Sequence, residues 1–267
     1  MTRTGGATGL FSPDSVTWRV HAEPLMGLAG MRALLLQALH PAAMAAIDEH
    51  SNYSEDPWSR LTRTSEFVGV ATFGTATEAM FAGSRVRAVH ARIHGTTPDG
   101  APYSADDPQL LAWVHSCMVA SFLEVTTRAG LRLSAAEQDA YIAEQVTSAM
   151  LVGLEPDEVP HDRAALLDYF AAVRPVLDCS PAARRAAKQV INPVPQHLLP
   201  TQVAAFAGPM GRVRQPRPAW AVVAGLAYAA LPPWARRLYA IGDLPGPAGL
   251  ADAATTLGLR ALRATLR

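Results

Sequence analysis

Two arginines on one predicted helix are the first residues whose types and spacing indicate chemistry. The pattern of apolar residues predicts a helix over residues 57–73, and at about 100° per residue Arg60, Arg63, Thr64 and Phe67 fall on its apolar face. A guanidinium keeps its charge at ordinary pH, so two arginines on a buried face require anionic partners. These partners are either carboxylates of neighbouring helices or an anionic ligand.

Three histidines lie close to the apolar faces of the next two predicted helices. His90 falls within the apolar stripe of residues 76–93, and His94 lies at the edge of that stripe. His115 falls among leucine, methionine and valine in residues 108–128. One such histidine is usually a core residue, but three so close together favour an imidazole ligand for haem iron or zinc. His90 is the leading candidate.

Other catalytic centres fit the sequence less well. Helical di-iron sites use Glu-x-x-His on a continuous helix, and Glu158 and His161 fall in a segment that two prolines predict to be a loop. The HExxH zinc motif, the phosphate-binding loops and the GxSxG elbow are absent from the sequence. Haem needs an apolar slot, one imidazole and cations for its propionates, which fits His90 with the two arginines. Without CxxCH the haem would be held non-covalently.

Helix signals dominate the elements that must position these residues. Asp107 before Pro108 and the capping box of Ser134 with Glu137 are typical helix starts, and strand signals are confined to Asp99-Gly100 in a loop predicted from residue 95 to 108. We predict an all-α, single-domain multi-helix bundle enclosing a haem pocket. The predicted helices span residues 24–39, 41–50, 57–73, 76–93, 108–128, 135–152, 162–173, 180–190, 219–230 and 248–265.

The predicted domain organisation has a short flexible start and one helical domain. Residues 1–23 read as a flexible N-terminal segment, and residues 24–267 as the helical haem-binding domain. The candidate motifs lie within residues 25–155, and residues 156–267 supply C-terminal helices of unassigned role. Within the latter, the proline-rich stretch 191–218 is predicted to cross the fold irregularly, and its arginines to lie in a solvated loop.

Composition and charge limit the compartment and the partners. The formal net charge is zero, which gives no electrostatic basis for a nucleic-acid partner. The two cysteines, Cys117 and Cys179, lie far apart without redox or metal spacing, and the N-terminus lacks a signal-peptide pattern, so we expect a cytoplasmic protein. Residues 25–47 contain Arg32 and Pro41, and residues 219–231 are too short to span a bilayer, so both are predicted to be buried rather than transmembrane.

The candidate residues occur in five motifs whose order and spacing resemble a known family. The motifs read LLQALHP from Leu35, EHSNYSEDPW from Glu49, RLTRT from Arg60, RAVHA from Arg87 and WVH from Trp113. Together they are similar to the latex-clearing protein (rubber oxygenase) catalytic-domain family, which includes the MpaB-type oxygenases. The resemblance covers roughly residues 25–155.

The resemblance implies a fold, a cofactor and residue roles. Members of the family are all-helical b-type haem proteins, and those of known activity use dioxygen to cleave carbon–carbon double bonds of isoprenoid chains. By position, His90 corresponds to the axial histidine, and Arg60 and Thr64 to the arginine and threonine beside the haem. Arg63 stands where latex-clearing proteins have a lysine that can bind the iron. Arginine does not ligate, but it can donate hydrogen bonds to dioxygen or peroxide at the distal face.

These observations predict a histidine-ligated haem-b oxidoreductase that uses dioxygen or peroxide on a small apolar, isoprenoid-like or unsaturated substrate, with a possible electron donor. Arg63, Arg60 and Thr64 are the expected catalytic residues, and Phe67 and His115 are expected to line the cofactor pocket with His90. Two alternatives stay open: a haem-binding carrier or sensor without turnover, and a helical partner-binding domain whose arginines pair internally. Substrate, redox partner and oligomeric state are not specified by the sequence.

Overall fold

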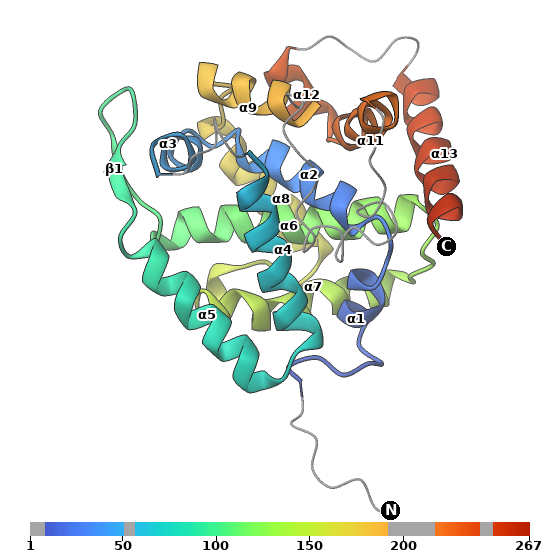
Figure 1. The fold of residues 1–267 in the computed structure, drawn as a ribbon, viewed down its shortest axis with the longest axis horizontal. Helices are drawn as coiled ribbons and strands as arrows, with labels where there is room; N and C mark the ends of the chain where they lie inside the picture. The colour runs from blue at the N-terminus through green and yellow to red at the C-terminus, as the bar shows by residue number, and fades with distance from the viewer. Residues whose placement is uncertain (1–8, 51–56, 192–216, 241–247) are drawn as a thin grey trace, which may run out of the picture.

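The structure is a computed structural model that describes residues 9–50, 57–191, 217–240 and 248–267 (Figure 1). The described chain is all-α apart from one short hairpin, which confirms the predicted fold class. Its α-helices are α1 (Val16–His21), α2 (Met26–Gln37), α3 (Pro41–His50), α4 (Pro57–Phe73), α5 (Ala76–His90), α6 (Pro108–Arg128), α7 (Ala135–Leu151), α8 (Arg163–Val173), α9 (Pro181–Ile191), α11 (Arg217–Ala229), α12 (Pro233–Tyr239) and α13 (Ala248–Leu266).

Helices α2 and α6 form the centre of the fold. They pack against each other more extensively than any other described pair, and the others surround them: α4 crosses them, α5 and α7 lie on one side, and α9 and α11 on the other (Figure 1). Leu28, Leu35 and Trp113 from this centre are almost fully buried. Burial of so much apolar surface along α2 confirms that residues 25–47 form core helices, broken where Pro41 starts α3.

A short helix, α1, lies within residues 1–23, which were expected to form a flexible N-terminal segment. Ser15 caps this helix by accepting a hydrogen bond from the Trp18 backbone, and Glu144 of α7 accepts the backbone N–H groups of Val16 and Thr17. A carboxylate at a helix N-terminus satisfies orphan donors and is favoured by the helix dipole. Sequence reasoning missed this helix because six residues give too little periodicity to detect.

A two-stranded hairpin replaces part of the predicted loop between residues 95 and 108. Strand β1 (His94–Thr96) pairs antiparallel with β2 (Pro102–Ser104), and the side chain of Thr97 binds the turn through the Ala101 backbone. Helix α5 consequently ends at His90 rather than at residue 93. The start of α6 is as predicted, because the Asp107 side chain accepts a hydrogen bond from the backbone of Gln109.

The C-terminal helices are tied to the central helices by two buried arginines. Arg32 of α2 donates to the carbonyl of Ala230, just after α11, and to the hydroxyl of Ser121 on α6. Arg263 of α13 forms a bidentate ion pair with Glu23, with both N···O distances 2.6 Å. Buried cations of this kind require hydrogen-bond acceptors, which here come from both halves of the chain. The crossing segment predicted for 191–218 lies mostly outside the described residues.

One described helix, α6, is long and apolar enough to cross a membrane by length and composition. However, 72% of its apolar window is buried inside the protein, as in the core helix of a soluble fold. The predicted burial of residues 219–231 holds for the described side chains Val223, Ala224 and Ala227.

Candidate functional site

The buried face of α4 differs from the predicted one. Leu61, Ser65 and Val68 are buried against α2 and α6, whereas Arg63 is exposed. The predicted burial of Arg63 is therefore wrong. A pattern of apolar residues counts serine and threonine as surface positions, but small hydroxyls fit between closely packed helices, and Thr72 binds His21 inside the core.

Arg60 is half-buried near the start of α4, as expected for a residue with an internal role. Its Nη2 donates to Oε1 of Gln37 on α2 across 3.4 Å, a long hydrogen bond. Thr64 and Phe67, on the next turns of α4, are also half-buried. Three of the four residues predicted on this face thus lie at the boundary between surface and core.

Gln37 is a residue of the site that sequence reasoning did not identify. Only 3% of it is exposed, its Nε2 donates to the Val114 carbonyl at 3.2 Å, and its own backbone carbonyl accepts from Trp113 Nε1 at 3.2 Å. These bonds fix the amide that meets Arg60. A lone amide side chain in the apolar segment LLQALH was the available signal, because a buried amide needs partners.

His90 lies in the last turn of α5, half-buried, with its Nδ1 atom buried and without a hydrogen-bond partner among the described residues. Burial lowers the pKa of His90, and the positive charge of Arg60 lowers it further, while Asp106 opposes both effects. The imidazole is therefore neutral near pH 7. Arg60 is therefore close enough for its charge to act on the His90 ring.

The other histidines have different environments. His115 is 6% exposed in α6, and burial lowers its pKa to about 4. His94 is exposed on β1, in agreement with its ranking below His90. His40, which the motif analysis included without a role, also has a buried Nδ1 with no partner in the described chain, and its ring centroid lies 6.0 Å from that of Trp113.

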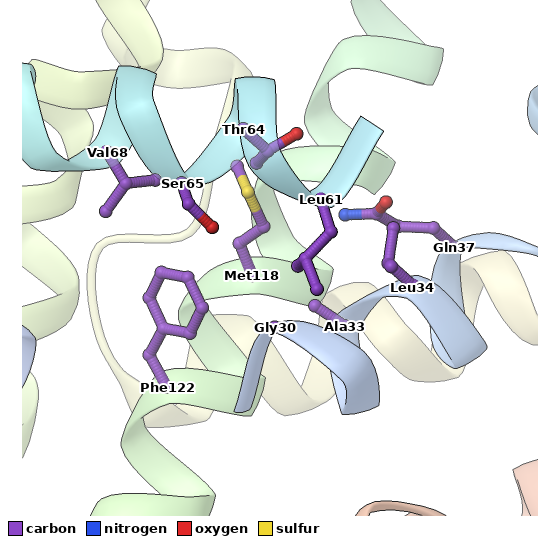
Figure 2. A pocket seen from close by; sticks show the side chains of 10 residues that line it. All are labelled: Gly30, Ala33, Leu34, Gln37, Leu61, Thr64, Ser65, Val68, Met118 and Phe122. Atoms are coloured by element: carbon purple, nitrogen blue, oxygen red, sulfur yellow. The ribbon is translucent and has the colours of Figure 1, made fainter. Parts of the chain in front are cut away.

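A narrow pocket lies between α2, α4 and α6 (Figure 2). Its cavity volume is about 20 Å³, and Figure 2 shows Leu61, Ser65 and Val68 of α4 above it, on the side toward α6 and α2. Gln37 closes one end, and Phe122 lies below Ser65 in this view. A space of this size admits about one water molecule, far less than a small-molecule site. Neither His90 nor His115 lines it.

A second pocket, with a cavity volume of about 20 Å³, lies on the other side of Leu34, between α2, α3, α4 and α9. Among the described residues that line it, Arg60 alone is charged or polar. Gln37 lines the first pocket and Arg60 lines the second, so their hydrogen bond connects the two linings.

No three His, Cys, Asp or Glu side chains gather to share a metal ion within the part of the chain that the structure describes. The segment from Glu158 to His161 follows the 3-10 turn Pro156–Glu158 and is not part of a continuous α-helix, as its prolines predict. A haem iron held by one axial histidine does not require several such side chains close together.

Residues 18–267 match the family described as ER-bound oxygenase mpaB/B'/Rubber oxygenase, catalytic domain. The chain belongs to this family. Membership in the mpaB/rubber oxygenase family confirms the resemblance based on residues 25–155, and it includes the C-terminal helices, for which sequence reasoning had no correspondence.

Two bacterial proteins are also similar to the chain. They are the uncharacterized proteins Mb2261 of Mycobacterium bovis and Rv2237 of Mycobacterium tuberculosis, each 24% identical over 161 residues. Each match covers 60% of this chain and 62% of the relative. No solved structure matches the chain.

Proposed function

We propose that this chain is a haem-dependent oxygenase that uses dioxygen or peroxide to oxidise a small apolar or unsaturated substrate. Membership in an oxygenase catalytic-domain family supports the reaction class. The observation that carries the cofactor assignment is the buried Nδ1 of His90, which no described residue partners, in the neighbourhood of Arg60.

His90 has the properties of an axial haem ligand. Iron binds an unprotonated imidazole nitrogen, and the lowered pKa of His90 keeps its ring neutral near pH 7. A histidine serving only the core normally has both ring nitrogens satisfied. When bound at His90, haem b would supply the iron centre that activates dioxygen or peroxide for attack on a carbon–carbon double bond.

Residues of α4 and α2 would hold and orient the reactants. Arg60 offers a permanent cation to an anionic group such as a propionate, and the fixed amide of Gln37 restricts where its guanidinium points. Thr64 and Phe67 would add a hydroxyl and an apolar surface. Packed side chains such as Leu61 and Val68 would exclude water from this region, which strengthens the electrostatic effect of the fixed groups.

The first experiment is an ultraviolet–visible spectrum of the full chain before and after haem is added. We expect a Soret band that His90→Ala abolishes or shifts and that His94→Ala leaves unchanged, because His94 is an exposed histidine only four residues away. Absence of a Soret band from the wild-type protein after haem addition contradicts the proposal.

His40 is the second candidate for the axial ligand, because its Nδ1 is also buried without a described partner. Burial lowers its pKa too, so its ring is also neutral near pH 7. His40→Ala is therefore measured beside His90→Ala. Loss of the Soret band in His40→Ala alone would overturn the assignment to His90 while leaving haem in place.

Turnover is tested by oxygen consumption of the haem-loaded protein with unsaturated apolar compounds. Arg63, which we predict to be the distal hydrogen-bond donor, is exposed, so its role needs a direct test. If Arg63 has that role, Arg63→Ala lowers oxygen consumption while the Soret band persists. An unchanged rate removes Arg63 from the site, and a Soret band without any turnover favours a carrier or sensor.

A further inference from the structure

We infer that the pocket between α2, α4 and α6 is a binding site for dioxygen, in which one molecule of the gas is held among apolar side chains beside Thr64. The inference rests on the proposed function only in taking dioxygen as the oxidant of the reaction. Binding of the gas itself does not require haem.

The pocket has the size of one very small molecule. Its volume of about 20 Å³ admits one particle of about the size of water, and dioxygen, with two small atoms, is only slightly larger. Small residues of α2 create this space, because Gly30 and Ala33 lie opposite Leu61 of α4 (Figure 2). A Cβ on Gly30 would lie 3.0 Å from Leu61 Cδ1, so a single methyl group takes up part of the space. An organic substrate is excluded by size.

The walls of the pocket are suited to an apolar gas rather than to water. Seven of its ten lining residues are glycine, alanine or larger apolar residues, and the other three are Gln37, Thr64 and Ser65. A buried water molecule makes about two to four hydrogen bonds. The amide of Gln37 is already bonded at both ends, to the Val114 carbonyl and to Arg60. Gln37 therefore offers a water molecule little.

The two hydroxyl groups of the wall do not make up this deficit. The Ser65 hydroxyl points down from α4 on the side of Phe122, whereas the Thr64 hydroxyl points away from Phe122 and Met118 (Figure 2). One hydroxyl is too few partners to hold a buried water molecule tightly. Transfer of an apolar molecule from water into such a space is favourable. The pocket therefore favours dioxygen over water.

The pocket lies beside residues of the proposed haem site. Thr64 is part of its lining, and Arg60, which precedes Leu61 on α4, binds the Gln37 that closes its end. The oxidant would therefore be held on the helix that carries the proposed orienting residues, in a space that the organic substrate cannot enter. Separate spaces keep the two reactants from competing for one site.

The test is nuclear magnetic resonance relaxation of methyl groups in the haem-free full chain, under dioxygen and under nitrogen. Dioxygen is paramagnetic, so a methyl group beside a dioxygen site relaxes faster under that gas. We expect a larger enhancement at Leu61 and Val68, which are 5% and 7% exposed, than at Leu166 and Val159, which are 7% and 5% exposed and lie outside the pocket. Equal enhancement at the two pairs would overturn the inference.

A matched pair of glycine substitutions then locates the gas. Gly30→Ala places a methyl group in the pocket and should reduce the enhancement at Leu61 and Val68 to that of the comparison methyl groups. Gly225→Ala makes the same change on α11, where nothing lies within 4 Å of the added Cβ, and should keep the wild-type values. Circular dichroism checks the folding of both. Enhancement that persists in folded Gly30→Ala would overturn the assignment to this pocket.

Ser65→Ala tests the polarity of the pocket without filling it. The substitution removes the hydroxyl that points toward Phe122, so the enhancement at Leu61 and Val68 should persist or rise. A fall to the level of Leu166 and Val159 would mean that the hydroxyl, rather than the apolar wall, holds the ligand. That result would overturn the inference even if Gly30→Ala did not fold.

The proposed function and this inference fail in different ways. A wild-type protein without a Soret band contradicts the haem assignment but leaves the methyl relaxation result standing. In the haem-loaded protein, Gly30→Ala should raise the KM for dioxygen about tenfold, the effect of overpacking by one methyl group, while kcat and the Soret band stay unchanged. An unchanged KM for dioxygen would overturn the role of the pocket in supplying the oxidant.

Discussion

Arg60 Nη2 lies 3.4 Å from Gln37 Oε1, so the cation of α4 is oriented by an amide that α2 and α6 hold in place. This contact lies between two pockets and in the neighbourhood of His90. It is one contact that gives the half-buried Arg60 side chain a defined direction.

The Gln37–Arg60 contact should appear as a coupling energy in a double-mutant cycle. We expect Gln37→Met and Arg60→Met to be non-additive by about 1 kcal/mol in the free energy of unfolding, because each substitution removes the same hydrogen bond. Urea denaturation of the four proteins measures this term. Gln37→Met combined with Arg63→Met is the matched control and should be additive, since Arg63 is exposed on the same helix. Additivity in the Arg60 cycle would mean that the long contact contributes nothing.

Removing the charge of Arg60 should raise the pKa of His90. Burial is the largest cause of the lowered pKa, and the positive charge of Arg60 is the second. The Arg60→Gln substitution removes only the second cause. Asp106→Asn should act in the opposite direction, because the Asp106 carboxylate raises the pKa. Nuclear magnetic resonance titration of the imidazole in the haem-free protein measures both shifts. An unchanged pKa in Arg60→Gln would place the two residues further apart than the structure has them.

The His21 network should make the protein less stable at acid pH. His21 Nδ1 lies 2.7 Å from Thr72 Oγ1, its Nε2 lies 3.1 Å from the Tyr141 hydroxyl, and burial lowers its pKa to about 3. The unfolded chain binds a proton here below about pH 6.5, whereas the folded chain does so only near pH 3, so stability falls as the pH drops through this window.

Because His21 takes up a proton in the unfolded chain but not in the folded chain over this range, it should lower the free energy of unfolding by about 2 kcal/mol between pH 7 and pH 5. Urea denaturation at the two pH values measures it, and His21→Gln should show a correspondingly smaller loss. His115 titrates in the same direction, with a pKa of about 4, and its contribution should persist in that variant. Equal losses in wild type and His21→Gln would show that His21 is not buried as a neutral ring.

Two glycine-to-alanine substitutions in helices should have opposite signs. A Cβ on Gly83 of α5 would lie 2.5 Å from the Leu151 carbonyl oxygen of α7, so Gly83→Ala should force the helices apart and cost about 1 to 3 kcal/mol. Around Gly225 of α11 nothing lies within 4 Å, so Gly225→Ala should stabilise the protein by about 0.5 to 1 kcal/mol through helix propensity. Thermal unfolding of both variants checks the pair. A stabilised Gly83→Ala would argue against close packing of α5 on α7.

Periodicity and capping signals were sufficient to predict most helices, including the capping box of Ser134 with Glu137. Long helices such as α6 carry many apolar positions, so their type is well determined. Short elements failed: α1 and α12 have few residues, and the β1–β2 hairpin has three-residue strands. Their stability comes from tertiary contacts, as with Glu144 at the start of α1, which a local pattern does not contain.

The site was only partly predictable because helix orientation depends on neighbours. Periodicity placed both arginines of α4 on one face, but packing against α2 and α6 buries Ser65 and leaves Arg63 exposed. The inward position of His90 and its advantage over His94 followed from the pattern of α5 alone. The role of Gln37 could not be predicted in this way, because its hydrogen-bond partners lie on α4 and α6, which are distant in the sequence.

Leu34 is the one described residue that lines both pockets, so its side chain separates them. A smaller side chain there would enlarge the space on both sides of α2, and a bulkier side chain would narrow both pockets at once. A substitution meant to change one pocket alone can lie on α9 for the second pocket or on α6 for the first.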